Sequence, residues 1–124
     1  MPVRSLNSSV LRWPDAQIVD QAVHGWSERM AKQHPDVLLI GYFGSYARGD
    51  WGVGSDVDIV IVVADSPLPF ERRATQWDAT ELPVPADVLV YTLAEWQAMD
   101  RQGRFLRTLG KEAVWTYRQE GMLP

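Results

Sequence analysis

"GSYARGDWGVGSDVDIVIVV", from Gly44 to Val63, places two carboxylates at the start of a strongly apolar run. Ten residues separate the Gly44-Ser45 pair from Asp56, and Asp58 follows one residue later. The apolar run after the carboxylates has no alternation, which predicts a strand that is buried on both faces and central in a sheet. Paired charge is unfavourable at the mouth of such a strand, so we expect a bound cation to neutralise it.

The segments around this run alternate between helical and strand patterns. Ile18, Ala22, Trp26 and Met30 recur every four residues and predict a leading helix over about 15–34, which ends before Pro35. The short apolar stretches 37–44 and 86–92 predict strands, and residues 112–117 predict a last edge strand.

Two further helices are expected between these strands. One lies around residues 70–80, before the prolines of "PVP". The other begins at Thr92, which has Glu95 in capping-box spacing, and ends at Gly110. On this second helix Arg101, Arg104 and Arg107 recur every three residues, which predicts a solvated face or a contact with an acidic partner.

The length and the order of elements indicate the fold class. A chain of 124 residues and 14.1 kDa is long enough for one domain with one core. We expect a single domain over 1–124, with a catalytic core at about 37–117 behind the leading helix. The predicted fold is α/β (α+β), a mixed sheet of about four strands flanked by helices.

Composition argues against several classes of protein. The net charge of -4 and the isoelectric point near 5.0 give no general field for a polyanion, so direct binding of long nucleic acids is not expected. The chain has no cysteine, and its apolar runs fall far short of the roughly 18 residues that span a bilayer. We therefore expect a soluble cytoplasmic protein without membrane contact, and assembly into homo-oligomers is compatible with the sequence.

The carboxylates favour a divalent metal. Because side chains alternate along a strand, Asp56 and Asp58 share a face, roughly 7 Å apart along the chain. Such oxygen ligands suit Mg²⁺, with Mn²⁺ as the alternative. Asp87 opens the 86–92 strand in the same way, and three carboxylates at one sheet end could hold two metals for displacement at phosphorus. The plainer alternative is a solvated strand end for Asp56 and Asp58, and a loop position for Asp87.

The loop between the strands contains the expected nucleotide-binding residues. Gly44 lets backbone amides approach a triphosphate, and Ser45 adds a hydroxyl at a helix start, although it could serve only as a cap. Arg48 and Ser55 lie where a phosphate could pass, and an exposed arginine can equally be only solvated. Trp51, in the same Gly-rich loop, is a candidate to stack on a base or a partner.

Taken together, the Gly-Ser pair, the spacing of ten, the Asp-x-Asp before an apolar strand and the later Asp87 strand resemble the nucleotidyltransferase superfamily of DNA polymerase beta. The short chain is most similar to the minimal nucleotidyltransferases, many of which are antitoxins of HEPN-domain toxins. The resemblance implies a nucleotidyltransferase fold in which Gly44 and Ser45 hold the nucleotide phosphates and Asp56, Asp58 and Asp87 bind the metals. It implies that Asp87 also helps to deprotonate the attacking hydroxyl.

The function that the resemblance implies is transfer of AMP from ATP, with Mg²⁺, to a tyrosine of a HEPN-type toxin. Two alternatives stay open: a small-molecule nucleotidyltransferase of the aminoglycoside-modifying type, and a non-catalytic antitoxin that only masks its partner. The first alternative normally requires an added acceptor-binding domain. The presence of all three carboxylates argues against the second.

Overall fold

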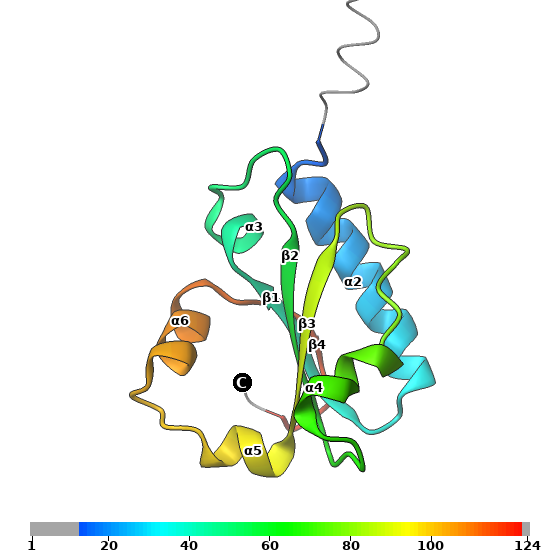
Figure 1. The fold of residues 1–124 in the computed structure, drawn as a ribbon, viewed down its shortest axis with the longest axis vertical. Helices are drawn as coiled ribbons and strands as arrows, with labels where there is room; N and C mark the ends of the chain where they lie inside the picture. The colour runs from blue at the N-terminus through cyan, green and yellow to red at the C-terminus, as the bar shows by residue number, and fades with distance from the viewer. Residues whose placement is uncertain (1–12, 123–124) are drawn as a thin grey trace, which may run out of the picture.

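The computed structural model describes residues 13–122, so residues 1–12 and 123–124 of the predicted domain lie outside the described part. Its four strands form one mixed sheet in the order β3-β2-β1-β4 (Figure 1). The strands are β1 (Val37–Phe43), β2 (Val57–Val63), β3 (Ala86–Thr92) and β4 (Val114–Arg118). β1 runs antiparallel to β2 and β4, and β3 runs parallel to β2. The prediction of a mixed sheet with a central β2 is confirmed.

Helices cover both faces of this sheet (Figure 1). α2 (Ala16–Gln33) lies along one face, whereas α5 (Leu93–Ala98) and α6 (Arg104–Glu112) lie on the other. The short helix α3 (Ser45–Arg48) follows β1, and α4 (Phe70–Arg73) with the 3-10 turn η1 (Ala74–Gln76) precedes β3. The helix predicted over 70–80 is therefore shorter than expected. No helix in residues 13–122 combines the length and the apolar character needed to cross a bilayer.

α2 begins and ends as its sequence predicts, but its buried face differs from the predicted one. Asp15 caps it by accepting a hydrogen bond from the Ile18 amide at 2.9 Å. A spacing of four drifts around a helix of 3.6 residues per turn, so Ile18 is turned outward and is 50% exposed. The buried face instead consists of Val19, Val23, Trp26, Ser27 and Met30.

The single helix predicted from Thr92 to Gly110 is wrong, because the chain forms two helices there. α5 ends at Met99, whose backbone is extended. The Asp100 side chain then accepts from the Gln102 amide at 2.9 Å, and the Asp100 carbonyl accepts from Gly103 at 2.9 Å. This local turn competes with helical hydrogen bonding. As a result Arg101 lies in the turn, before the helix that carries Arg104 and Arg107.

The hydrophobic core has one layer on each face of the sheet. On the α2 side, Trp26 and Val23 pack with Ile59 and Ile61 of β2. On the α5 and α6 side, Val60 and Val62 of β2 join a second cluster that includes Trp96 and Leu109. β2 is buried on both faces, which is why its sequence is apolar without alternation.

Candidate active site

The exit from β1 brings the backbone close to a carboxylate. Gly44 has φ +87° and ψ -155°, a conformation that is nearly exclusive to glycine. A Cβ atom at this position would overlap Asp58 Oδ2. The Gly44 carbonyl then accepts from the Arg48 amide at 2.9 Å and starts the single turn of α3. The glycine thus lets the chain turn sharply after β1 while its backbone stays close to Asp58 of the neighbouring strand β2.

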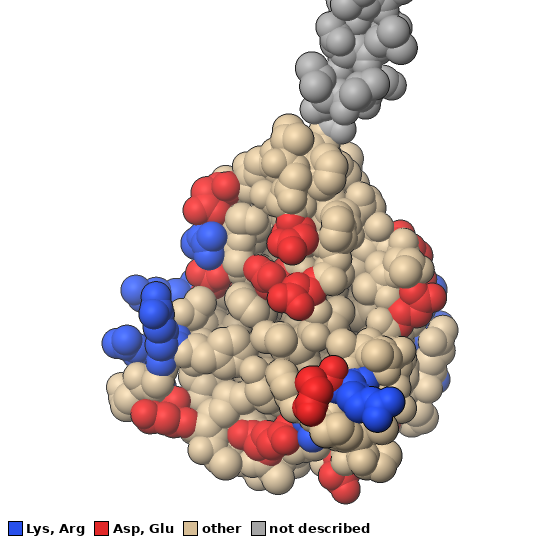
Figure 2. Space-filling view, in the orientation of Figure 1, with Lys and Arg blue, Asp and Glu red and all other residues tan. Residues whose placement is uncertain are grey.

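The three predicted carboxylates lie at one end of the sheet. β2 and β3 pair in parallel with Asp58 opposite Asp87, and Asp56 precedes β2 by one residue. Alternation along β2 puts Asp58 on the face of Val60, the face that α5 and α6 partly cover. Figure 2 shows acidic side chains gathered on this face, over the upper ends of β2 and β3.

The charges at this sheet end are poorly compensated. The pKa of Asp58 is raised, first by burial and then by the negative charges of Asp56 and Asp87, with Glu112 adding to the effect. Arg48 opposes this rise in the pKa of Asp58. Within residues 13–122, no three acidic or histidine side chains converge tightly enough to enclose a metal ion.

The donor chemistry nevertheless fits a divalent metal. Asp56, Asp58 and Asp87 offer only carboxylate oxygens, the ligand type that Mg²⁺ and Mn²⁺ take, often with substrate phosphates completing the shell. The pKa of Asp58 is raised first by burial and then by the neighbouring negative charges, and a divalent cation would relieve the second of these effects. Asp58 and Asp87 are directly opposite each other in the parallel β2–β3 register.

The predicted phosphate-binding residues lie in α3 and the loop after it. Arg48 pairs with Asp50 at 3.2 Å and with Glu112 at 3.2 Å, and about half of its side chain is exposed. Ser45 Oγ makes no hydrogen bond to other described residues, which leaves the hydroxyl available. Ser55 has a structural contact instead, because its Oγ accepts from the Gly52 amide at 2.9 Å. The roles assigned to these residues stay predictions.

Glu112 belongs to this site, although sequence reasoning missed it. Its Oε2 accepts a hydrogen bond from the Gly44 amide at 2.6 Å, and its side chain is only 13% exposed. Glu112 is the last residue of α6, just before β4 pairs with β1, and this pairing returns the chain to the β1 exit. The 68 residues between Glu112 and Gly44 explain why no local pattern linked them.

Trp51 is engaged within the protein. Its ring stacks on Tyr46 with centroids 5.5 Å apart and planes 9° apart, and the Tyr46 hydroxyl donates to the Pro14 carbonyl at 2.8 Å. This stack fastens the Gly-rich loop to the start of α2. The prediction that Trp51 is a candidate to stack on a base or a partner is not tested by this contact and stays a prediction.

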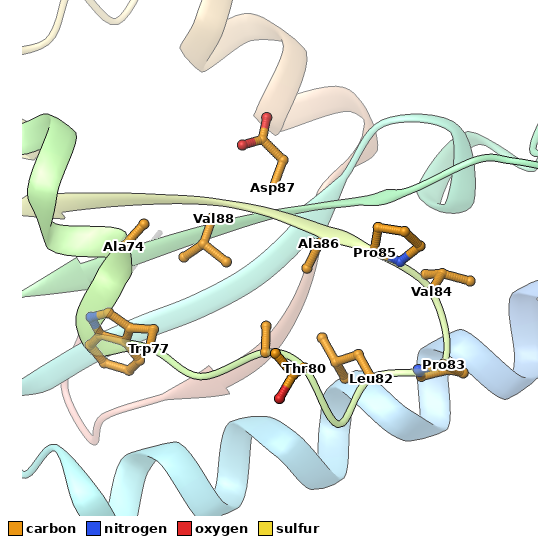
Figure 3. A pocket seen from close by; sticks show the side chains of 11 residues that line it. Ala74, Trp77, Thr80, Leu82, Pro83, Val84, Pro85, Ala86, Asp87 and Val88 are labelled. Carbon is orange, nitrogen blue, oxygen red and sulfur yellow. The ribbon is translucent and has the colours of Figure 1, made fainter.

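A groove of about 650 Å³ lies beside the site but mainly on the other side of β3. Its walls come from the segment 74–85 and include Trp77, Leu82 and Val84. In Figure 3 the Ala86 and Val88 side chains point toward this segment, whereas Asp87 points away from it. The groove therefore lies on the α2 side of the sheet, and the carboxylate face is a separate, open surface.

Comparison with known proteins agrees with this geometry. Residues 26–111, more than half of the chain, match the family described as "Nucleotidyltransferase domain". A protein of Methanocaldococcus jannaschii, described as a proposed protein adenylyltransferase, is 40% identical over 48 residues. That match spans 39% of this chain and 48% of the relative, so the chain aligns with about half of the relative's length.

Solved structures share the fold at low sequence identity. A proposed nucleotidyltransferase from Sulfolobus solfataricus has a TM-score of 0.60 and 22% identity, over 88% of this chain and 89% of that chain. A chain from a toxin-antitoxin crystal structure with AMP-PNP has a TM-score of 0.58 and 20% identity, over 78% and 74% of the two chains. A chain from a mutant of the toxin-antitoxin MntA-HpeT has a TM-score of 0.53 and 21% identity, over 76% and 71%. At these identities the likeness establishes the fold.

Proposed function

The chain belongs to the nucleotidyltransferase domain family, and from this premise we propose that it transfers AMP from ATP to a hydroxyl group on a partner protein. The observation that carries the proposal is the position of Asp56, Asp58 and Asp87 at one sheet end, with Asp58 against the backbone of Gly44. Carboxylates next to a backbone donor suit a reaction that binds metal and phosphate together.

Each residue has a role in this proposal. Asp56, Asp58 and Asp87 would hold Mg²⁺, with Mn²⁺ as an alternative, and the metal would supply charge neutralisation and orientation of the phosphates. Gly44 and Ser45 donate hydrogen bonds toward the phosphates, and Arg48 supplies the positive charge of α3. Ser55 shapes the loop that carries these donors.

The reaction itself is a substitution at the α-phosphorus. The acceptor oxygen forms a new bond to the α-phosphorus, the bond to the β-phosphate oxygen breaks, and pyrophosphate leaves. The proton of the acceptor hydroxyl passes to the carboxylate of Asp87, which lies at the edge strand β3 where an acceptor can approach. Atoms and charge balance without any redox partner.

We further propose that the acceptor is a tyrosine of a HEPN-type toxin and that the chain acts as its antitoxin. The M. jannaschii relative is described as a proposed protein adenylyltransferase, and two solved relatives of the same fold come from toxin-antitoxin structures. The open carboxylate face supports a macromolecular acceptor, because a protruding side chain can reach it. A tyrosine hydroxyl is suitable because it is comparatively acidic, with a pKa of about 10.

Intact-mass spectrometry of the chain incubated with its neighbour-encoded partner tests the proposal. We expect the partner to gain the mass of AMP only with ATP and Mg²⁺, to carry it on tyrosine, and to lose its toxicity. Asp56→Asn should abolish the mass gain. An unmodified partner that is nevertheless inhibited in a stable complex would instead indicate masking, and transfer to an aminoglycoside by the isolated chain would indicate a small-molecule enzyme.

A further inference from the structure

In the proposed phosphate site, the main-chain amide already donates a hydrogen bond to a carboxylate. Glu112 Oε2 lies 2.6 Å from the Gly44 nitrogen and 3.2 Å from Arg48 Nη1. These two groups are a backbone N–H at a sharp strand exit and a guanidinium, both of which are standard ligands of phosphate oxygens. The Glu112 side chain is 13% exposed, so it is held in this position.

The charge of Glu112 works against an incoming triphosphate. Asp56, Asp58 and Asp87 already make this sheet end negative, and Glu112 adds a further negative charge that reaches Asp58. Arg48 is the cation that opposes these charges, and Glu112 and Asp50 both pair with it. The carboxyl end of α6, where the helix dipole is negative, also lies here because Glu112 is the last helical residue.

We propose that Glu112 competes with the nucleotide phosphates for Gly44 and Arg48. Its carboxylate must leave these two residues before a triphosphate can bind there. This inference rests on the proposed nucleotidyltransferase function, since it assigns the phosphate position of the same site. It makes Glu112 a residue that sets the threshold for nucleotide binding. The arrangement would keep the site closed until metal-bound ATP replaces the carboxylate with its own oxygens.

The structure provides room for this exchange. The backbone at Glu112 is tied to the sheet through β4, where Val114 pairs with Tyr42, so the side chain has to rotate. α6 is anchored through Leu109 and through Phe105, whose ring packs edge-on against Phe43 at 5.8 Å. Beneath α6 lies a cavity of about 380 Å³, lined in part by Leu106, Gly110 and Ala113. Glu112 does not line this cavity, so the movement that would free Gly44 and Arg48 is rotation of the Glu112 side chain with the α6 backbone in place.

Two substitutions test separately the charge of Glu112 and its hydrogen bond with the Gly44 amide. Glu112→Gln removes the charge but keeps an oxygen that can accept from Gly44, whereas Glu112→Ala removes both. Glu28→Gln is the matched control, because Glu28 is an exposed glutamate on α2, on the opposite face of the sheet. The probes are ATP, tripolyphosphate without a base, and adenosine without phosphate, each titrated calorimetrically with Mg²⁺.

We expect Glu112→Gln to bind ATP and tripolyphosphate about five- to tenfold more tightly than the parent, as removal of one nearby like charge allows. Glu112→Ala should bind them at least as tightly as Glu112→Gln, while adenosine binding and the Glu28→Gln control should not change. Weaker or unchanged binding of both phosphate compounds by the two Glu112 variants would overturn the proposal and would indicate a supporting or purely structural role.

The binding affinities, measured together with AMP transfer to the partner, distinguish this inference from the proposed function. Tighter tripolyphosphate binding by the Glu112 variants, without any AMP transfer to a partner, would uphold the competitor role and overturn the proposed AMP transfer to a partner protein. AMP transfer together with unchanged affinities would uphold the proposed function and overturn the competitor role of Glu112. Melting curves of each variant without ligand verify that it is folded, and Glu112→Gln, which keeps the hydrogen-bonding oxygen, is the variant expected to fold like the parent.

Discussion

The Asp58 carboxylate fills the space that a side chain at position 44 would need. The Gly44 backbone has φ +87° and ψ -155°, and a Cβ there would overlap Asp58 Oδ2. The same glycine presents its amide to Glu112. The first residue of the Gly-Ser pair is thus required by backbone conformation and by space, apart from any role in binding phosphate.

Gly44→Ala should lower the free energy of unfolding by about 2–4 kcal/mol, because strain and overlap act together. Gly49→Ala is the matched control, since Gly49 also has a positive φ of +92° but has open space where its Cβ would be. The control should lose only about 1–2 kcal/mol. Urea unfolding of the two variants measures the difference, and equal losses would show that the contact with Asp58 has little importance.

Asp58 is less stable as an anion in the folded chain than in water. Its pKa is raised by burial and by Asp56 and Asp87. A carboxyl group whose pKa is higher in the folded state binds its proton more tightly there. Its contribution to stability therefore falls as the pH rises from the ordinary aspartate value to the raised one, and the loss persists at neutral pH.

Asp58→Asn should accordingly stabilise the metal-free protein at pH 7 by about 0.5–1 kcal/mol, while it abolishes AMP transfer. The gain should shrink as the pH falls through the raised pKa of Asp58 toward the ordinary aspartate value of about 3.9, because the folded parent side chain takes up its proton in this range. Chemical denaturation at several pH values measures this, with Asp36→Asn, an exposed turn residue, as control. A stability gain that does not change with pH would contradict the electrostatic explanation.

Among the elements, α4, β3 and α5 are joined by one buried arginine. Arg73 donates to the Leu68 carbonyl at 2.8 Å, to the Val90 carbonyl at 3.2 Å and to both oxygens of Glu95. Its side chain is 7% exposed. Glu95 also completes the capping box of α5 through the Thr92 amide. The guanidinium thus fixes the short helices to the outer edge of β3.

Arg73→Ala should reduce the free energy of unfolding by about 2 kcal/mol, because it leaves the Leu68 and Val90 carbonyls without this donor and removes the cation that pairs with Glu95. Arg73→Lys should recover only part of this loss, since an ammonium group cannot reproduce the forked geometry. Arg72→Ala, at the exposed neighbouring position, should change stability by less than about 0.5 kcal/mol. If thermal and urea unfolding gave similar losses for Arg72→Ala and Arg73→Ala, the clamp would have no special role.

At the scale of the whole molecule, the two faces of the sheet differ. α2 packs along one face with a continuous core, whereas α5 and α6 cover the other face and leave its upper end to the carboxylates (Figures 1 and 2). Basic side chains also gather over α6 in Figure 2, and Arg104, Arg107 and Lys111 of this helix are exposed. The open end suits an acceptor that arrives on another molecule.

Mg²⁺ and ATP together should raise the melting temperature more than the sum of their separate effects. Metal and triphosphate each supply ligands or charge that the other needs, so binding to the folded state is coupled. Differential scanning calorimetry with Mg²⁺, ATP, both, and both with EDTA tests this. Asp56→Asn should remove the excess stabilisation, and purely additive shifts up to several millimolar ATP would argue against a joint metal and nucleotide site.

Local chemistry allowed several features to be predicted from the sequence. The apolar run of β2, the boundaries of β3 and the extent of α2 all depend on neighbouring residues, and the structure agrees with each. Alternation along a strand predicted that Asp56 and Asp58 share a face, whereas the parallel pairing that sets Asp87 opposite Asp58 is seen only in the structure. Their roles stay predictions until transfer is measured.

Tertiary structure decided what depends on residues that are distant in the sequence. Glu112 accepts from the Gly44 amide only because the chain returns from α6 into β4 beside β1. The stack of Trp51 on Tyr46 is likewise seen only in the fold. The break before α6 coincides with a turn in which the Asp100 side chain accepts from the Gln102 amide, a bond that competes with helical hydrogen bonding. Sequence therefore determined which strands form and where the carboxylates lie, because strand pattern is local, whereas the packing of distant segments determined which groups meet them.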